Sequence, residues 1–336
     1  MKIKLLLILL LIAALAMANL LLGTVDISSG EIFRILGGDR TDIVHYNIIW
    51  KSRLPQTVTA IMAGAGLSVS GLQMQTVFRN PLAGPSVLGI SNGAALGVAF
   101  VVLLSGQIGG VALSQLGFMG DAALNVAAIA GALAVMGLIA WVSGRVQNSV
   151  TLLIIGVMIG YLATAVISVL KFFSVEEDVH AYVIWGLGSF ARVSAGQVWL
   201  FAAIMAVLLP LSMLLVKQMN ILLLGDRYAR NLGVNIQCSR LLIICSSGML
   251  VAIVTAYCGP IMFIGLAVPH LCRGLWHTND HRILMPATLL VGALLALFCN
   301  LVARLPGYEG ALPVNSVTAL IGAPVVATIL FRKRNR

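Results

Sequence analysis

The residues best suited to chemistry lie in one polar stretch, residues 220–240, between two long apolar segments. Its charged side chains are Asp226, Arg227, Arg230 and Arg240. The run from Asp226 to Leu232 is compatible with a helix and ends at Gly233, a residue type that readily adopts the left-handed turn that stops helices. We therefore expect a short amphipathic helix on a membrane surface, available for contact with another molecule. A solvated connector is the alternative interpretation.

Motifs for nucleotide or hydrolytic chemistry are not found in the sequence. A Walker A loop needs a Gly-Lys-Ser/Thr run to cradle phosphates, and none of the six lysines follows a glycine. Neither H-E-x-x-H nor G-x-S-x-G occurs. The isolated histidines His45, His180 and His270 are interpreted as interfacial or packed side chains. The chain is therefore not expected to be an enzyme or to hold a metal or cofactor of its own.

The composition identifies an integral membrane protein. The 336 residues are 60% hydrophobic and 10% charged, with a mean hydropathy of +1.03, whereas soluble domains carry about 25% charged residues. The five cysteines show no C-x-x-C spacing and are interpreted as packing residues. They are Cys238, Cys245, Cys258, Cys272 and Cys299.

Apolar runs of about 20 residues predict transmembrane helices, and ten candidates occur along the chain. They cover residues 3–22, 54–78, 86–104, 121–142, 150–173, 196–217, 240–258, 260–272, 283–303 and 313–331. The segment 260–272 is too short to cross straight and is expected to be broken or partial. The first run resembles a signal peptide with an Ala16-Met17-Ala18 cleavage pattern, but its continuation through Leu22 favours an uncleaved first helix.

The charge distribution predicts the orientation. With both termini in the cytoplasm, 14 of the 21 Lys and Arg residues and only two of the 11 acidic residues face inward, as the positive-inside rule favours. The net charge of +10 is thus mainly a topology signal. The outer loops, including the acidic run Glu176–Asp178 that we read as a solvated turn, are too short to form a solute-binding domain. Solute capture must come from another protein or from a cavity in the membrane.

Three stretches combine proline, glycine and polar residues at or near the membrane. They are residues 79–85, residues 259–270 and residues 312–324. Irregular backbone at membrane depth is tolerated only against protein or a water-filled cavity. We therefore expect residues 259–270 to lie against protein or such a cavity. The two prolines of residues 79–85 predict a tight, stiff turn, and residues 312–324 predict the start of a helix that lines a pathway.

These stretches together resemble the FecCD family, the permease subunits of ABC importers for iron–siderophore complexes, haem and cobalamin. The matching motifs are Arg53-Leu54-Pro55, Ser70-Gly71, Gln75, residues 80–85, residues 88–94, residues 259–270 and Gly322-Ala323-Pro324. The resemblance covers essentially the whole chain. It implies an all-α type II ABC importer permease fold of about ten transmembrane helices, formed by residues 1–336 as a single transmembrane permease domain.

The resemblance also implies roles for particular residues. A cytoplasmic coupling loop in residues 220–240 docks a separate ATPase through Gly225, Asp226, Arg227, Ala229, Arg230, Leu232 and Gly233. The inner gate is formed by Asn80, Leu82, Ser149 and Val150, where Val150 replaces the small polar residue of the cobalamin permease. Binding-protein docking falls on Arg53 and Arg304, and Gln56 replaces a further arginine of that system. Spans 2–5 and 7–10 form an inverted repeat.

The resulting hypothesis is a homodimer in the bacterial inner membrane. Two copies would work with two ATPases, which bind the ATP and magnesium, and with one substrate-binding protein that is periplasmic or lipid-anchored. No nucleic acid partner is expected. An ATP-independent secondary transporter or channel is the alternative, and a membrane scaffold is a third possibility. The absence of carboxylates from the span centres argues against ion coupling, and the sequence does not distinguish siderophore, haem and cobalamin.

Overall fold

The computed structural model describes residues 2–334, except residues 24, 109–117, 147–148, 232 and 305–311. The described residues form α-helices joined by short turns. The helices are α1 (Lys2–Leu21), α2 (Ser29–Leu36), α3 (Ile43–Ile48), α4 (Leu54–Val77), α5 (Ile90–Ile108), α6 (Phe118–Ser143), α7 (Ser149–Phe173), α8 (Glu176–Gly186), α9 (Ala195–Met213), α10 (Val216–Leu223), α11 (Asp226–Asn231), α12 (Ile236–Cys258), α13 (Ile264–Trp276), α14 (His281–Ala303) and α15 (Val314–Arg334). Short π- or 3₁₀-helical segments are η1 (Ile49–Arg53), η2 (Pro85–Leu88) and η4 (Phe190–Arg192).

Seven helices in the described part are long and apolar enough to cross a membrane, namely α1, α4, α6, α7, α9, α12 and α14. Three shorter apolar helices, α5, α13 and α15, lie among them. The polytopic all-α fold with about ten spanning helices is therefore confirmed. Two predicted boundaries were wrong, because α13 occupies residues 264–276 rather than 260–272, and α5 begins at Ile90 rather than at residue 86.

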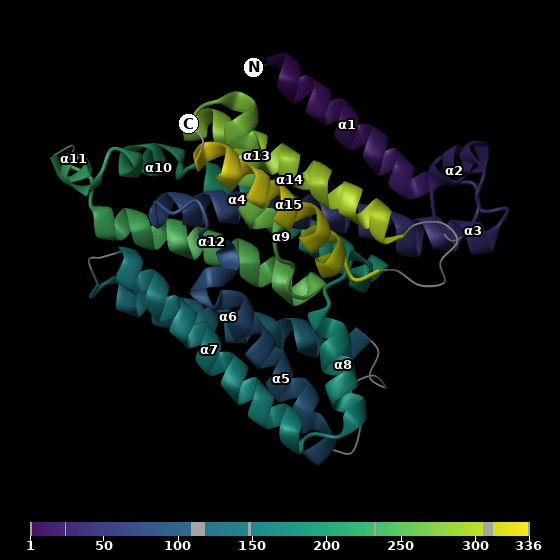
Figure 1. Cartoon of the computed structure of the whole chain (residues 1–336). Coiled ribbons are helices and arrows are strands. Elements are labelled where there is room, and N and C mark those ends of the chain that lie inside the picture. Colours follow the sequence, from purple (N-terminus) through teal and green to yellow (C-terminus); the bar gives the residue numbers. More distant parts are fainter. Residues whose placement is uncertain are drawn as a thin grey trace.

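Helices α4 and α12 form the centre of the bundle. Their apolar windows are 83% and 72% buried, against 11% for α1 and 28% for α6 and α7. Helices α1, α13, α14 and α15 lie on one side of this pair, and α5 to α8 lie on the other (Figure 1). The exposed apolar faces of the outer helices are suited to lipid or to another apolar protein surface.

Glycines allow the central helices to approach closely. A Cβ at Gly71 of α4 would lie 1.7 Å from the carbonyl oxygen of Gly265 in α13. A Cβ at Gly64 of α4 would lie 2.3 Å from the carbonyl oxygen of Gly292 in α14. No larger side chain fits at either contact, so backbone packs directly on backbone.

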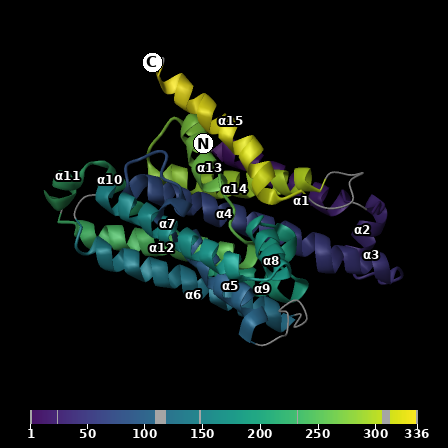
Figure 2. The same ribbon diagram turned by 60° about the horizontal axis from the view of Figure 1, so that its bottom comes forward.

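The two ends of the bundle carry different surface helices. Helices α10 and α11 lie at one end, and α2 and α3 lie at the opposite end in both views (Figures 1 and 2). The expected turn at Glu176–Asp178 was wrong, because these residues form the first turn of α8. Acidic side chains at that position interact favourably with the positive end of the helix dipole. This interaction explains why the acidic run begins a helix, although its polarity suggested a solvated turn.

Candidate translocation pathway and coupling surface

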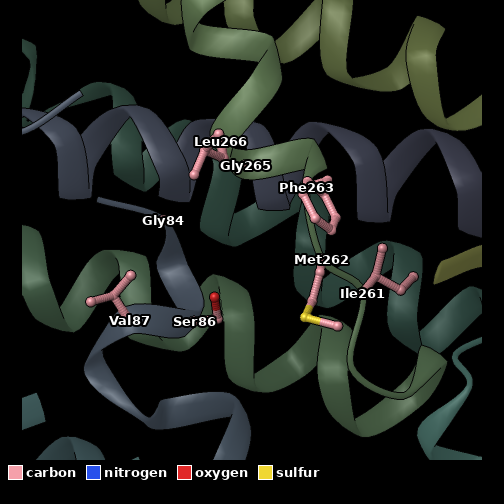
Figure 3. Close-up of a pocket in the computed structure, with 8 residues that line it drawn as sticks. All are labelled: Gly84, Ser86, Val87, Ile261, Met262, Phe263, Gly265 and Leu266. Carbon is pink, nitrogen blue, oxygen red and sulfur yellow. The ribbon is translucent and has the colours of Figure 1, made fainter. Parts of the chain in front are cut away.

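Two irregular loops enter the bundle and meet at one cavity. The α4–α5 loop, residues 78–89, and the α12–α13 loop, residues 259–263, face each other across a cavity of about 160 Å³ (Figure 3). The residues that line it are Gly84, Ser86, Val87, Ile261, Met262, Phe263, Gly265 and Leu266. The irregular backbone of residues 259–270 therefore lies against a cavity, one of the two surroundings expected for it.

The wall of this cavity is almost entirely apolar. Ser86 carries the one hydroxyl group among the eight lining residues and lies on the opposite side of the gap from Met262 (Figure 3). A second cavity of about 200 Å³ shares Ser86 and Val87 and extends to Val157, Gly160 and Tyr161 of α7. Walls with few polar groups bind a solute weakly, which suits passage better than retention.

The α4–α5 loop carries two residues that were predicted to form a gate. The backbone N–H of Leu82 donates to Asn80 Oδ1 at 2.9 Å, and the Leu82 side chain is 46% exposed. Val150, in the first turn of α7, is also exposed at 58%. The side chain of the fourth predicted gate residue, Ser149, lies outside the described residues.

Two glycines of α7 allow the end of the α4–α5 loop to pack closely against this helix. A Cβ at Gly156 would lie 2.9 Å from the Cα atom of Leu88. Gly89 adopts a left-handed conformation with φ +72°, and the Asn92 side chain donates to the Gly160 carbonyl oxygen at 3.1 Å. The Gly156-x-x-x-Gly160 spacing thus provides a close backbone contact.

The α12–α13 loop is held by Asn315, at the start of α15. Asn315 Nδ2 donates to the carbonyl oxygen of Pro260 at 2.6 Å, and Asn315 Oδ1 accepts from the N–H of Met262 at 2.9 Å. The loop ends at Phe263, which has φ +68°, an uncommon conformation for a residue other than glycine. The sequence placed Asn315 in a pathway helix but did not identify this contact.

The short helix that the sequence predicts from Asp226 onwards is present as α11, residues Asp226–Asn231. Gly225 and Gly233, on either side, have φ values of +102° and +77°, so both ends use the glycine conformation that the sequence predicted for Gly233. Ala229 is fully buried and Arg230 is exposed. The Arg227 side chain and the whole of Leu232 lie outside the described residues.

Polar contacts join the end of α4 to α13 and α14, and the start of α14 to α10. Gln75 Oε1 accepts from Arg273 of α13 at 2.5 Å, and Thr76 Oγ1 lies 2.8 Å from His281 Nε2 of α14. Asp280, the N-cap of α14, accepts from Asn220 Nδ2 of α10 at 2.7 Å. The Arg282 N–H and the Asn220 side chain hold the pKa of Asp280 below its usual value.

The two arginines predicted to dock a binding protein lie together at the α3 end. Arg53 is 1% exposed and donates to the carbonyl oxygens of Leu20 and Leu21 at 2.7 and 2.9 Å. A Cβ at Gly23 would lie 2.8 Å from Arg53 Nη2 and 3.1 Å from Arg304 Nη2. The structure therefore brings both guanidinium groups to the same turn.

The α4–α5 and α12–α13 loops break the bundle of spanning helices and meet at an apolar cavity. This architecture is typical of membrane transport proteins. The family model of the FecCD transport family matches residues 7–332. The chain belongs to this family.

Related proteins and a solved structure agree with this assignment. The vitamin B12 import system permease protein BtuC of Klebsiella pneumoniae is 37% identical over 288 residues, covering 86% of this chain and 83% of that protein. BtuC of Escherichia coli is 37% identical over 307 residues, covering 91% and 90%. A metal-chelate type ABC transporter in an inward-facing conformation superposes with a TM-score of 0.85, at 30% identity and covering 99% of this chain and 100% of that one. The chain is thus a multi-pass permease subunit of an ABC importer, a transport component that works with ATPase subunits.

Proposed function

We propose that this permease moves cobalamin, or an iron complex such as a siderophore or haem, across the bacterial inner membrane. The similarity to two vitamin B12 import permeases over most of both chains carries the proposal. The apolar cavity between the two loops supports it, since a large solute held by a binding protein needs a smooth passage and not a second tight site.

The assembly we propose contains two copies of this chain, two ATPases and one substrate-binding protein. Helix α7 contributes Val157 and Tyr161 to the second cavity. The same helix also exposes Val150, Ile154 and Met158. A second copy facing α7 and α15 would complete the path. The ATP and magnesium would be bound by the ATPases, and both termini would be cytoplasmic.

The proposed dock for the ATPases is the surface of α11 and its flanking turns. Helix α11 protrudes at one end of the molecule (Figure 1). Its residues carry the pattern of the family's coupling loop, Gly225, Asp226, Arg227, Ala229, Arg230, Leu232 and Gly233. The ATP-driven closure of the ATPases would displace α11, and gates at Asn80, Leu82, Ser149 and Val150 would then open alternately with the opposite end of the path.

The proposed dock for the binding protein includes Arg53 and Arg304. Their guanidinium groups reach the same turn at Gly23, so acidic side chains from outside would relieve the repulsion between them. Arg53 is only 1% exposed and Arg304 is partly exposed, so a binding protein would contact Arg304 directly, with Arg53 behind it. Arg304→Glu should therefore weaken docking in a salt-dependent way.

The experiment that tests the function uses the complex purified from its own host. Its mass, vanadate-sensitive ATP hydrolysis and uptake into proteoliposomes would be measured with cyanocobalamin, a ferric siderophore and haem in turn. Two permeases with two ATPases and ATP-dependent uptake of one cargo would support the proposal. An oligomer of this chain alone that moves solute without ATP would contradict it and favour a secondary transporter.

A further inference from the structure

Asp226, the first residue of the coupling helix α11, is held from both sides by arginines of its own chain. Its Oδ1 atom lies 2.5 Å from Arg79 Nη2, and its Oδ2 atom lies 2.8 Å from Arg240 Nη2. Both carboxylate oxygens thus bind inside the permease. A residue that served only to contact an ATPase would not need two internal partners.

Arg79 connects this carboxylate to the predicted gate. It stands directly before Asn80 at the start of the α4–α5 loop and has φ +47°. The same Nη2 atom also donates to the carbonyl oxygen of Leu222, the second-last residue of α10, at 3.0 Å. One side chain therefore holds the loop to the α10–α11 turn at two points.

Arg240 connects the same carboxylate to the other loop. It lies in the second turn of α12, and its side chain is 10% exposed. Helix α12 then continues to Cys258, so that its 23 residues form a rod of about 35 Å. The α12–α13 loop starts at the next residue, Gly259. Asp226 therefore contacts the start of the first loop directly, and it reaches the second loop only through the length of α12.

We propose that Asp226 is a positioning residue for transport, which carries movement of α11 to the α4–α5 loop through Arg79 and to α12 through Arg240. This inference rests on the proposed function as an ATP-driven importer. The Arg79 and Asp226 side chains are 43% and 35% exposed, and ion pairs at such positions contribute little to folding stability. Removing this pair should therefore impair coupling while the fold persists.

The test uses the complete complex in proteoliposomes, and the readout is solute moved per ATP hydrolysed. Arg79→Gln and Asp226→Asn should each lower this ratio about 5- to 10-fold, and the double variant should be no worse than Asp226→Asn alone, because Asp226→Asn already removes the contacts with both arginines. In Arg79→Gln, which lies outside the proposed dock, ATPase copurification and the thermal unfolding midpoint should stay unchanged. Arg145→Gln is the matched control, because Arg145 stacks on Trp141, with 3.7 Å between its guanidinium carbon and the ring centre.

Four results would overturn the inference. Single variants with the wild-type ratio would show that the pair carries no coupling, and additive losses in the double variant would show that the two residues act separately. Loss of ATPase copurification in Arg79→Gln would show that the Arg79–Asp226 pair serves docking and not coupling. A wild-type complex without ATP-dependent uptake would overturn the proposed function and this inference with it. This case differs from the others because the wild type and the Arg145→Gln control would both lack uptake.

Discussion

The α4–α5 loop and the α12–α13 loop interrupt the helix bundle, and they share a sequence pattern. Each contains Gly-Pro, at Gly84-Pro85 and at Gly259-Pro260, and each ends in one residue with positive φ, directly before a new helix. That residue is Gly89 in the first loop and Phe263 in the second. The two halves of the chain thus break their spans in the same way.

The helices that support the two loops are also alike. Helix α7 presents Gly156 and Gly160 to the α4–α5 loop, and a Cβ at Gly322 of α15 would lie 2.9 Å from the Phe263 Cβ atom. In sequence, Asn-Ser-Val-Thr occurs at residues 148–151 and again at residues 315–318, at the start of each supporting segment. These parallels fit the inverted repeat that the family resemblance implies.

The loops differ in how firmly they are held. Two side-chain hydrogen bonds from Asn315 fix the middle of the α12–α13 loop. The α4–α5 loop is held at its start, through Arg79, and beyond it the described contact of Asn80 is local, to the N–H of Leu82. Glycine at position 89 tolerates several backbone conformations, whereas phenylalanine at 263 keeps positive φ only where its surroundings impose it. We infer that the α12–α13 loop is the fixed wall and that the α4–α5 loop is the part that moves.

The largest effect is expected where α13 begins, at its contact with α4. Gly71→Ala would place a Cβ 1.7 Å from the Gly265 carbonyl oxygen and 2.7 Å from the Gly265 Cα atom, and neither is a side chain that could turn away. We expect destabilisation by more than about 3 kcal/mol, or loss of folded protein.

Thermal unfolding of the Gly71→Ala variant can be followed by the exposure of the buried thiols of Cys258, Cys272 and Cys299. Gly137→Ala in α6 is the control, because nothing lies within 4 Å of a Cβ there, and it should be neutral or slightly stabilising. A Gly71→Ala protein as stable as that control would show that α13 is not rigidly seated.

A smaller effect is expected at Gly89, the last residue of the α4–α5 loop. Gly89→Ala would strain a left-handed residue and place a Cβ 3.0 Å from the Gly156 carbonyl oxygen. We expect a loss of about 2 kcal/mol in stability, together with slower uptake. Gly186→Ala, in open space at the end of α8, should leave both unchanged. If Gly89→Ala cost as much as Gly71→Ala, the two loops would be equally fixed.

Asn315→Ala measures how firmly the α12–α13 loop is held. The variant leaves the Met262 N–H and the Pro260 carbonyl oxygen without these partners, and we expect a loss of about 1–2 kcal/mol. Asn92→Ala is the matched variant at the other loop, where one bond to Gly160 is lost, so its effect should be about half as large. Equal thermal shifts for the two variants would contradict the proposed difference between the loops.

The sequence predicted the structural elements that are determined by neighbouring residues in the chain. Apolar length predicted the spanning helices, Gly233 predicted the end of α11, and the Gly-Pro pairs predicted the irregular backbone. Helix α8 was missed because its acidic first turn looks like any exposed loop until the helix dipole is considered.

The contacts between distant residues could not be predicted in this way. Arg79 and Asp226 are 147 residues apart, and Met262 and Asn315 are 53 apart, so no local pattern indicates either pair. The cavity was expected from proline and glycine at membrane depth, but its lining by Ser86 and Met262 depends on which two loops meet. The positive φ of Phe263 is likewise imposed by tertiary contacts, since phenylalanine does not favour it.

The smallest stability effect is expected for Phe263→Gly, which makes the two loops alike. Glycine relieves about 1 kcal/mol of left-handed strain, but it loses the contact with Gly322 and gives more freedom to the unfolded chain, so the net change should be within about 0.5 kcal/mol. Phe263→Ala loses the same contact and keeps the strain. Alanine should therefore be less stable than glycine by about 1 kcal/mol, the reverse of their usual order in helices. An alanine variant as stable as the glycine variant would show that position 263 relaxes out of the left-handed region, and that the α12–α13 loop is as adaptable as its counterpart.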